Sequence, residues 1–306
     1  MTMSAATDEW RFCESDAEML QHFLQGTSRT FALAIPLLDP ARRFQVGLTY
    51  LLFRVADSIE DASEVPTGRK LQLLEDFESA LEADQSGSAS FCCGGLWPAG
   101  TAVEQLMQAT PKLLQLFHEL PAPVSAAIRR SLCGTLQGMR AFLSGSAASG
   151  QQICIESIAD LRLYCYSVAG IVGELLTDLF VLHHPCPSEA AGSLRDLAVP
   201  FGEFLQLINI LKDAVGDLSD GRVFIPSGAT RQAVTEIAFG SHRDAARYLQ
   251  LLDAWNFPAD VLAFCRFIFL LAEGSLECLQ RGGPGSKLSR SAVQAILEKV
   301  QICGAS

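Results

Sequence analysis

The chain has 306 residues, of which 49% are hydrophobic and only 19% are charged, so it contains ample material for a sizeable core. Its formal net charge of -11 argues against nucleic acid and anionic membranes as partners, because both require basic surface stripes. An acidic protein that binds an anionic substrate must do so through a local basic cluster or through a metal ion.

The start of the chain carries no targeting pattern. Residues 1–10 lack a basic region followed by an apolar core, so no secretory signal is predicted, and residues 1–15 are expected to be a flexible N-terminal segment. The longest apolar stretches, 171–182 and 261–279, are interrupted by charged residues, so neither is predicted to span a membrane. We therefore expect a cytoplasmic protein.

Helical periodicity covers nearly all of the chain. Apolar residues recur at intervals of three and four, whereas the alternation typical of strands is scarce. Loops rich in Gly, Ser or Pro are expected at 84–100 and 144–151, and no repeat or charge block indicates a domain boundary. We predict a single all-α domain over residues 1–306, with a central cavity between its helices. The expected helices are 17–23, 31–38, 41–62, 70–83, 101–119, 123–143, 158–183, 188–218, 229–239, 243–255, 258–280 and 289–301.

The first acidic cluster lies within the predicted helix 41–62. Asp57 and Asp61 are four residues apart, and Tyr50 and Arg54 precede them at steps of three to four, so all four share one helix face. Like charges at this spacing destabilise a helix, and a divalent cation held by carboxylate oxygens would offset that cost. The simpler alternative for an isolated pair of this kind is a solvated helix face.

A second cluster repeats the spacing far along the chain. Asp213 and Asp217 are again four residues apart, and Asn209 precedes them by four. If the two clusters lay on facing helices across one cavity, their carboxylates would hold several Mg²⁺ ions and, through them, a diphosphate.

Five separated strings carry a family resemblance. They are residues 26–31 (Gly-Thr-Ser-Arg-Thr-Phe), 50–61, 164–173 (with Val-Ala-Gly), 206–217 and 221–226. In this order they resemble the squalene and phytoene synthase family, from about residue 28 to 226 and more loosely to 301. The resemblance implies an all-helical isoprenoid synthase fold that joins two allylic diphosphates head to head.

The resemblance also implies roles for individual residues. The expected metal ligands are Asp57, Glu60, Asp61, Asn209, Asp213 and Asp217. The expected contacts to substrate diphosphate are Ser28, Arg29, Tyr50, Arg54, Gln206, Lys212 and Arg222. The expected catalytic residues are Tyr164, matching a tyrosine credited with a role in the first half-reaction, together with Arg54, Asp57, Asp61, Asp213 and Asp217.

A basic stretch near the C-terminus resembles one that has been linked to NADPH in squalene synthases. Lys287 and Arg290, with Asn209, are the expected cofactor contacts, although the same stretch would also suit an ordinary basic helix start. Two positions depart from the family's second motif: Gly216 stands where Glu is common, and Lys212 where Arg is common. One carboxylate fewer and a Lys without a bidentate fork would weaken that metal site.

Other residues have structural alternatives. Ser28 could be a helix N-cap, which is compatible with substrate binding. Tyr164 could be a core tyrosine with a satisfied hydroxyl. Gly170 and Gly173 remove bulk from one helix face, which would let a prenyl chain approach the backbone.

The leading functional hypothesis is a squalene synthase that uses two farnesyl diphosphates, Mg²⁺ and NADPH. The close alternative is the same chemistry ending in dehydrosqualene, hydroxysqualene or phytoene, the last from geranylgeranyl diphosphate. An apolar product would bring the protein into peripheral contact with a membrane. A hypothesis of another class is an assembly or scaffold protein that kept the fold and lost catalysis.

Overall fold

The computed structural model describes residues 11–83, 91, 93, 95–146 and 152–304. Contacts within the chain divide it into two compact units, residues 1–140 and 141–306. The single domain over 1–306 therefore stays a prediction. Residues 1–10, and with them most of the segment expected to be flexible, lie outside the described residues. The helix that begins at Glu14 takes in the last two residues of that segment.

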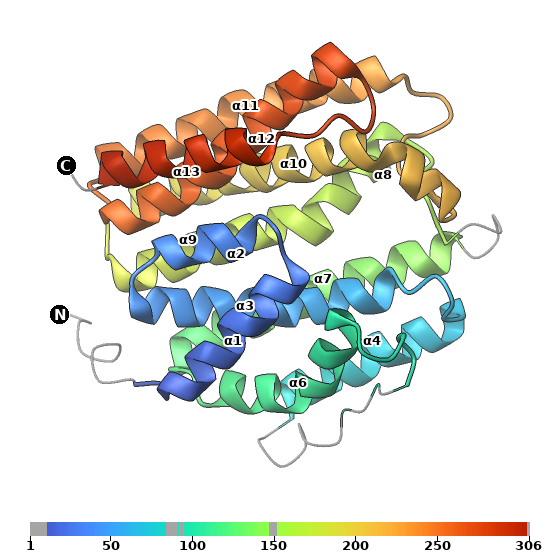
Figure 1. Cartoon of the computed structure of the whole chain (residues 1–306), viewed down its shortest axis with the longest axis horizontal. Helices are drawn as coiled ribbons and strands as arrows, with labels where there is room; N and C mark the ends of the chain where they lie inside the picture. Colours follow the sequence, from blue (N-terminus) through green and yellow to red (C-terminus); the bar gives the residue numbers. More distant parts are fainter. Residues whose placement is uncertain (1–10, 84–90, 92, 94, 147–151, 305–306) are drawn as a thin grey trace. The chain divides into compact units, whose positions relative to one another are not determined.

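The secondary-structure elements described in the first unit are all helices. Its third helix, α3, begins at Pro40, where the Asp39 carboxylate accepts a hydrogen bond from the Arg42 backbone N–H at 3.0 Å. This helix is buried along most of its length and packs against α1, α4 and α6 (Figure 1). The elements are α1 (Glu14–Thr27), α2 (Phe31–Ala34), η1 (Ile35–Leu37), α3 (Pro40–Glu60), α4 (Thr67–Glu82), α6 (Ala102–His118) and α7 (Ala122–Ser146), which runs across the boundary into the second unit.

The second unit is built around the long helix α10, which packs against α9, α11 and α12 (Figure 1). A short parallel strand pair, β1 with β2, joins Ile153 to Arg222 and Cys154 to Val223. The elements are β1 (Ile153–Cys154), α8 (Ile158–Cys165), η3 (Tyr166–Gly170), α9 (Ile171–His183), α10 (Ser188–Ser219), β2 (Arg222–Val223), α11 (Arg231–Ala254), α12 (Ala259–Gly282) and α13 (Arg290–Gly304).

Glycines in the second unit let two helices come together at their backbones. A Cβ added at Gly173 would lie 2.2 Å from the Ala198 carbonyl oxygen, and one added at Gly202 would lie 2.2 Å from that of Ala169. At Gly170 the added atom would meet the Tyr166 ring at 2.9 Å. The expectation that Gly170 and Gly173 leave room for a prenyl chain is therefore wrong, because α10 and a neighbouring ring fill that space.

The all-α prediction is confirmed, and most expected helices appear within a few residues of their predicted bounds. Three differences stand out. The predicted break at residues 239–243 is absent, and α11 continues through Gly240 because Ala238, Ser241 and Ala245 extend its buried face. The predicted helix 158–183 contains the π-helical turn η3, and the β1–β2 pair is new.

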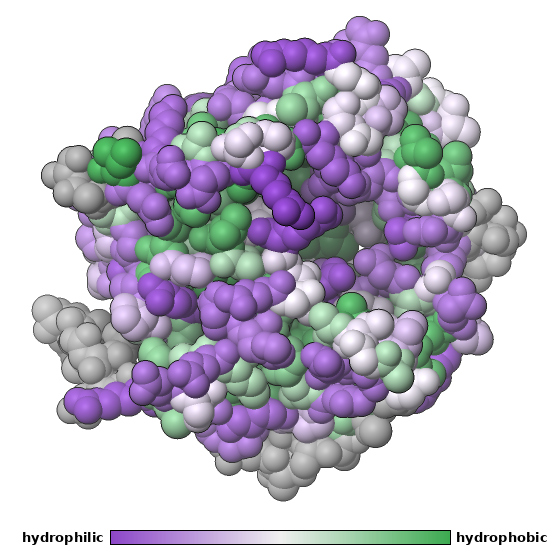
Figure 2. Space-filling model, viewed as in Figure 1, coloured by the Kyte–Doolittle hydropathy of each residue, from purple (hydrophilic) through white to green (hydrophobic). Residues whose placement is uncertain are grey.

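The hydropathy of the surface and of one long apolar segment bears on contact with membranes. Figure 2 shows a face that is mostly hydrophilic, with apolar residues in smaller patches between. Within the described residues, the segment Ile158–His183 is long and apolar enough to cross a membrane by length and composition, and 44% of its most apolar window is buried. The core helix of a globular protein meets the same two criteria, and this segment carries Glu174 and Asp178.

Candidate active site

The first predicted cluster occupies the last turns of α3. Tyr50, Arg54 and Asp57 lie at successive turns of this helix, and Asp61 is its C-cap, whose backbone N–H donates to the Asp57 carbonyl at 2.8 Å. The Arg54 Nη1 atom is 4.0 Å from Asp57 Oδ2. The structure thus brings the predicted arginine and carboxylates of this string together on one helix.

Ser28 connects the chain before α2 to this face of α3. Its hydroxyl oxygen accepts a hydrogen bond from the Phe31 backbone N–H at 2.9 Å, and Ser28 and Tyr50 are joined by a side-chain hydrogen bond. The rings of Phe31 and Tyr50 lie 4.9 Å apart. Ser28 thus accepts from the first residue of α2 as a capping side chain does, although the N-cap position of α2 is Thr30 and Ser28 itself is the C-cap of α1. The same residue lies beside the predicted diphosphate contact Tyr50. Arg29, next along the chain, is exposed.

Asp57 is in an electrostatically unfavourable position. Although 42% of its side-chain surface is accessible, surrounding protein atoms desolvate the carboxylate and raise its pKa to about 7. Arg54 opposes this shift and Asp61 adds to it. The Arg54 Nε atom is buried and has no hydrogen-bond partner among the described residues. The Asp57 carboxylate could therefore bind a cation, and the Arg54 Nε–H could donate to an anion. A metal ion bound together with an anionic ligand would satisfy both groups.

Glu60 differs from its two acidic neighbours. It is 4% exposed, and the Lys70 Nζ atom of α4, itself 1% exposed, donates to the Glu60 backbone carbonyl at 2.6 Å. Glu60 therefore belongs to the buried contact between α3 and α4, whereas Asp61 is exposed. Its role as a metal ligand stays a prediction. Lys70 was not anticipated from the sequence, where a lysine early in a helix gives no sign of burial.

The second predicted cluster lies on the C-terminal half of α10. Asn209, Asp213 and Asp217 follow one another at intervals of four, so they share a helix face. The Lys212 ammonium donates to Asn209 Oδ1 at 2.9 Å and lies 3.3 Å from Asp213 Oδ2. Lys212 thus acts as a local counter-charge within the motif, and Gln206, one turn before, is half-buried.

Arg222 reaches the end of the same helix from β2. Its Nε and Nη2 atoms lie 3.2 Å and 2.8 Å from Asp217 Oδ1, and Nη2 also lies 3.2 Å from Asp220 Oδ2. The strand pair fixes this arrangement, because Arg222 is the β2 residue paired with Ile153. Asp217 is therefore ion-paired in this structure.

Tyr164 is part of an aromatic cluster. It is 4% exposed, and its ring lies 5.2 Å from that of Phe142, edge-on, and 5.0 Å from that of Phe224. Phe224 follows Arg222 by two residues, so one short segment approaches both Tyr164 and Asp217. Phe142 and Phe224 were not predicted as site residues, because nothing local in the sequence indicates which aromatic residues meet. The alternative of a core tyrosine describes its burial correctly.

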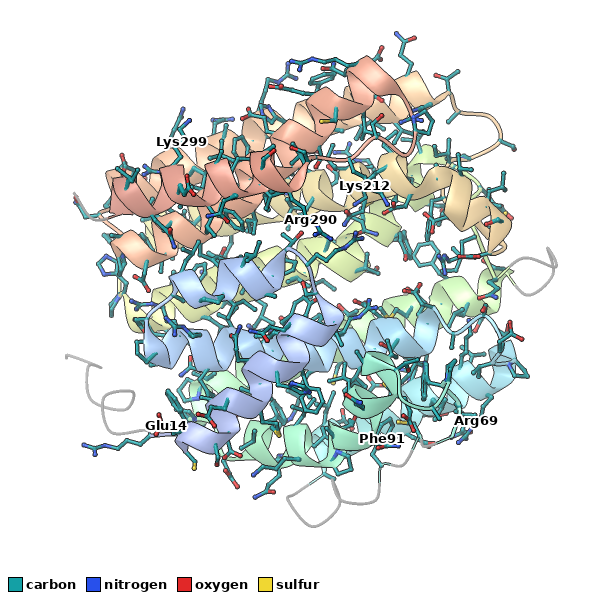
Figure 3. All side chains as sticks on the ribbon, in the orientation of Figure 1. Glu14, Arg69, Phe91, Lys212, Arg290 and Lys299 are labelled. Atoms are coloured by element: carbon teal, nitrogen blue, oxygen red, sulfur yellow. The ribbon has the colours of Figure 1, made fainter. Side chains whose placement is uncertain are left out.

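The predicted cofactor stretch lies beside α10. The Gly285 backbone N–H donates to the Lys212 carbonyl at 3.1 Å, which anchors the loop between α12 and α13 next to the second acidic motif. Lys287 and Arg290 are both exposed. Figure 3 shows Lys212 on α10 and Arg290 at the start of α13 on the same side of the second unit.

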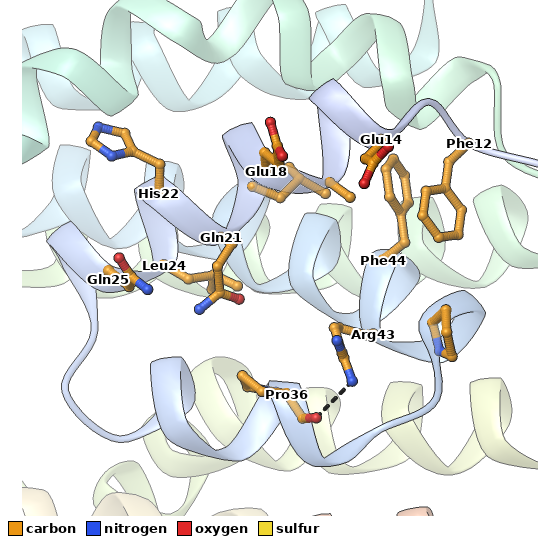
Figure 4. Close-up of a pocket in the computed structure, with 13 residues that line it drawn as sticks. Phe12, Glu14, Glu18, Gln21, His22, Leu24, Gln25, Pro36, Arg43 and Phe44 are labelled. Atoms are coloured by element: carbon orange, nitrogen blue, oxygen red, sulfur yellow. Dashed lines mark hydrogen bonds between the residues drawn. The ribbon is translucent and has the colours of Figure 1, made fainter.

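A pocket of about 470 Å³ opens in the first unit and is lined by residues of α1, η1 and the start of α3. Phe12 and Phe44 stack at one end, and Arg43 donates to the Pro36 carbonyl at 2.8 Å (Figure 4). None of the predicted site residues lines it. The chemistry argued from the acidic motifs therefore does not reside in this pocket.

The described residues do not form a compact group of metal-binding side chains. Within the described part of the chain, no three His, Cys, Asp or Glu residues gather in a group that could hold a metal ion. Each acidic motif supplies oxygen ligands of the kind Mg²⁺ prefers, with Arg54 or Lys212 beside them for an anion. Mg²⁺ keeps several waters and is often held by one or two carboxylates together with substrate phosphates, so the residues fit this ion.

Comparison with known proteins decides the family. A sequence model of the squalene/phytoene synthase family matches residues 24–254, a range that contains both acidic motifs, Tyr164 and Arg222. The chain belongs to this family. Squalene synthase ERG9 of Candida albicans is 31% identical over 214 residues, which is 69% of this chain and 46% of that protein. The chain thus spans less than half the length of this curated relative.

Solved structures share the fold. The structure of TcSQS with the ligand E5700 superposes with a TM-score of 0.78 at 22% identity, covering 96% of this chain and 92% of that one. A dehydrosqualene synthase in complex with ligand has a TM-score of 0.60 at 18% identity, covering 94% of this chain and 96% of that one. At these identities the likeness concerns the fold, which is the all-α isoprenoid synthase fold expected from the sequence.

Proposed function

We propose that the protein condenses two farnesyl diphosphate molecules head to head, through a cyclopropylcarbinyl diphosphate, to squalene, with Mg²⁺ and NADPH. The observation that carries the proposal is the family match over residues 24–254, within which each acidic motif presents its carboxylates along one helix beside a basic side chain. The curated relatives at about 30% identity, among them ERG9, are squalene synthases, which supports farnesyl diphosphate as the substrate.

Each unit supplies polar residues that we assign to diphosphate binding. In the first unit, Arg54 offers an unsatisfied guanidinium nitrogen and Tyr50 a protonated hydroxyl, since burial raises the Tyr50 pKa. Ser28 orients Tyr50, and Arg29 is exposed nearby along the chain. In the second unit, Lys212 and Arg222 supply positive charge, and Gln206 lies six residues before Lys212 along α10.

The Mg²⁺ ions would be held by oxygen ligands of the two acidic motifs, namely Asp57, Asp61, Asn209, Asp213 and Asp217. When bound, Mg²⁺ would neutralise charge that builds on the departing diphosphate. Glu60 would contribute least, because it is buried against α4. The basic residues Arg54 and Arg222 would hold the anion in place and lower the cost of breaking the allylic C–O bond.

Tyr164 and its aromatic neighbours would stabilise the carbocation. Ionisation of one substrate leaves an allylic cation, which the double bond of the other substrate attacks with loss of a proton. The rings of Tyr164, Phe142 and Phe224 form an apolar surface whose π faces can stabilise such a cation and exclude water. The Tyr164 hydroxyl is the group we assign to guiding that proton away.

The ending of the reaction depends on the final cation. NADPH, when bound, would supply the hydride that gives squalene. Lys287 and Arg290 would bind its phosphates, because both are exposed and their loop is anchored at Lys212. Proton loss would instead give dehydrosqualene, and water would give hydroxysqualene. We propose a cytoplasmic enzyme with peripheral membrane contact during product release.

The test is an incubation of purified protein with farnesyl diphosphate and Mg²⁺, with and without NADPH, followed by mass spectrometry of the extracted products. Squalene formed only with NADPH is the expected result, and Asp57→Asn and Asp213→Asn should each abolish it. Dehydrosqualene or hydroxysqualene in both samples would replace the proposed product. Phytoene from geranylgeranyl diphosphate alone would replace the substrate. No product from either diphosphate, with the protein folded, would favour an assembly or scaffold role.

A further inference from the structure

The C-terminal end of α3 has an unusual partner. The last four carbonyls of a helix have no intrahelical donor and must be satisfied from elsewhere. The Glu60 carbonyl, at the last residue of α3, accepts a hydrogen bond of 2.6 Å from the Lys70 ammonium. A cation at this end of a helix also interacts favourably with the helix dipole.

Burial makes the contact strong. Lys70 is 1% exposed, and an ammonium group is rarely buried unless its charge is compensated. It comes from α4, so it ties the end of one helix to the first turns of the next. Because the acceptor is a backbone carbonyl, the bond fixes the path of the chain at Glu60 rather than the position of a mobile side chain.

The turn fixed in this way carries the first acidic motif. Asp57 and Asp61 lie on either side of Glu60 and are joined by the hydrogen bond from the Asp61 N–H to the Asp57 carbonyl, at 2.8 Å. Lys70 donates to the backbone of the residue that lies between them, so it affects the position of both carboxylates through the path of the chain.

We propose that Lys70 is a positioning residue, which holds the last turn of α3 so that Asp57 and Asp61 are presented together to Mg²⁺. This inference rests on the proposed function of the acidic motif. It assigns a role to a residue outside the motif, ten positions after Glu60.

The test compares Lys70→Met, which keeps length and apolar bulk but removes the charged donor, with Leu74→Ala as control. Leu74 lies one turn further along α4, is fully buried, and is a matched packing change. Hydrogen exchange of the amides of residues 57–61 is measured in metal-free protein. Thermal stabilisation by Mg²⁺ with inorganic pyrophosphate is titrated separately.

Lys70→Met should speed hydrogen exchange at the Asp61 amide roughly tenfold and raise the half-saturating Mg²⁺ concentration by a similar factor. A tenfold change is what the loss of one hydrogen bond to a charged group is expected to produce. Leu74→Ala should leave both values within about twofold of wild type after allowance for its overall stability. Equal effects of the two variants would reduce Lys70 to ordinary packing and overturn the proposal.

Two further outcomes are decisive. If Lys70→Met does not fold, Lys70→Gln keeps an uncharged donor and should give intermediate values, and wild-type values for it would refute the role. If wild-type protein shows no response to Mg²⁺ with pyrophosphate, the metal site of the proposed function fails, and the positioning role fails with it. The exchange data separate that case from one in which only Lys70 was misassigned.

Discussion

Arg222 binds the last carboxylate of the second motif through two nitrogen atoms, with Nε 3.2 Å and Nη2 2.8 Å from Asp217 Oδ1. Both side chains are only 15% exposed. The pair joins the end of α10 to β2 and lies two residues from Phe224, the ring neighbour of Tyr164. A single ion pair therefore links a predicted metal ligand to the segment that approaches the predicted catalytic tyrosine.

Replacing Arg222 tests how much this ion pair contributes to the free energy of unfolding. Arg222→Gln would leave a largely buried Asp217 without its main counter-charge and should lower the free energy of unfolding by about 1–3 kcal/mol. The matched control is Arg247→Gln, whose partner Asp244 lies 3.4 Å away at the surface, with side chains 67% and 40% exposed. That change should cost less than about 0.5 kcal/mol. Similar losses for the two variants in chemical denaturation would contradict the expectation.

Gly173 tests the close packing of α9 on α10. Gly173→Ala would place a Cβ 2.2 Å from the Ala198 carbonyl oxygen, so the helices must separate, at a cost of about 1–3 kcal/mol or more. Gly240→Ala is the control, because nothing lies within 4 Å of a Cβ at that helical position. It should stabilise the protein by up to about 1 kcal/mol. Thermal denaturation of both variants measures the difference, and a neutral Gly173→Ala would show that the approach is looser than described.

Gly216 marks a place where a carboxylate could be added. No heavy atom lies within 4 Å of a Cβ built there, so Gly216→Glu should be accommodated. In metal-free protein, Glu at position 216 has a helix propensity about 1 kcal/mol better than that of Gly, but its charge is repelled by the neighbouring aspartates, which offsets this gain. With Mg²⁺ and pyrophosphate it should increase thermal stabilisation relative to Gly216→Gln, which has the propensity gain without the charge. Equal Mg²⁺ responses of the two variants would show that position 216 does not face the ion.

Asp57 should make the stability of the metal-free protein depend on pH. Its pKa in the folded protein is about 7 against an ordinary value of 3.8, so between these values the folded state binds more protons than the unfolded state. The stability that the protonated group contributes is complete below pH 4 and is lost as the pH rises through 7. Asp57→Asn should remove this decline, which urea unfolding in EDTA at several pH values would measure.

An exposed carboxylate provides the reference for that experiment. Asp253 is 65% exposed and pairs with Arg266 at the surface. Asp253→Asn should therefore leave the pH profile of wild-type protein unchanged between pH 4 and 7. A wild-type profile that does not fall in this window, or an Asp57→Asn profile that falls equally, would refute the assignment to Asp57.

Several features of the candidate site were predictable because they are local. The i, i+4 spacing of Asp57 with Asp61, and of Asp213 with Asp217, places each pair on one helix face wherever the helix packs. Ser28 is of a residue type favoured for capping, and its hydroxyl accepts from the first residue of α2. The expected break at residues 239–243 shows the limit of such reasoning, because burial of the flanking residues Ala238, Ser241 and Ala245 favours one continuous helix.

The helical elements, the family and the residues of the acidic motifs follow from local sequence patterns, because periodicity and spacing act within a few turns of chain. Three contacts became known from the packed structure alone: Gly173 packs against a carbonyl, Arg222 pairs with Asp217, and Lys70 binds the end of α3. Each of these joins positions on different elements. Such contacts depend on how helices dock, and that is set by packing over many side chains at once.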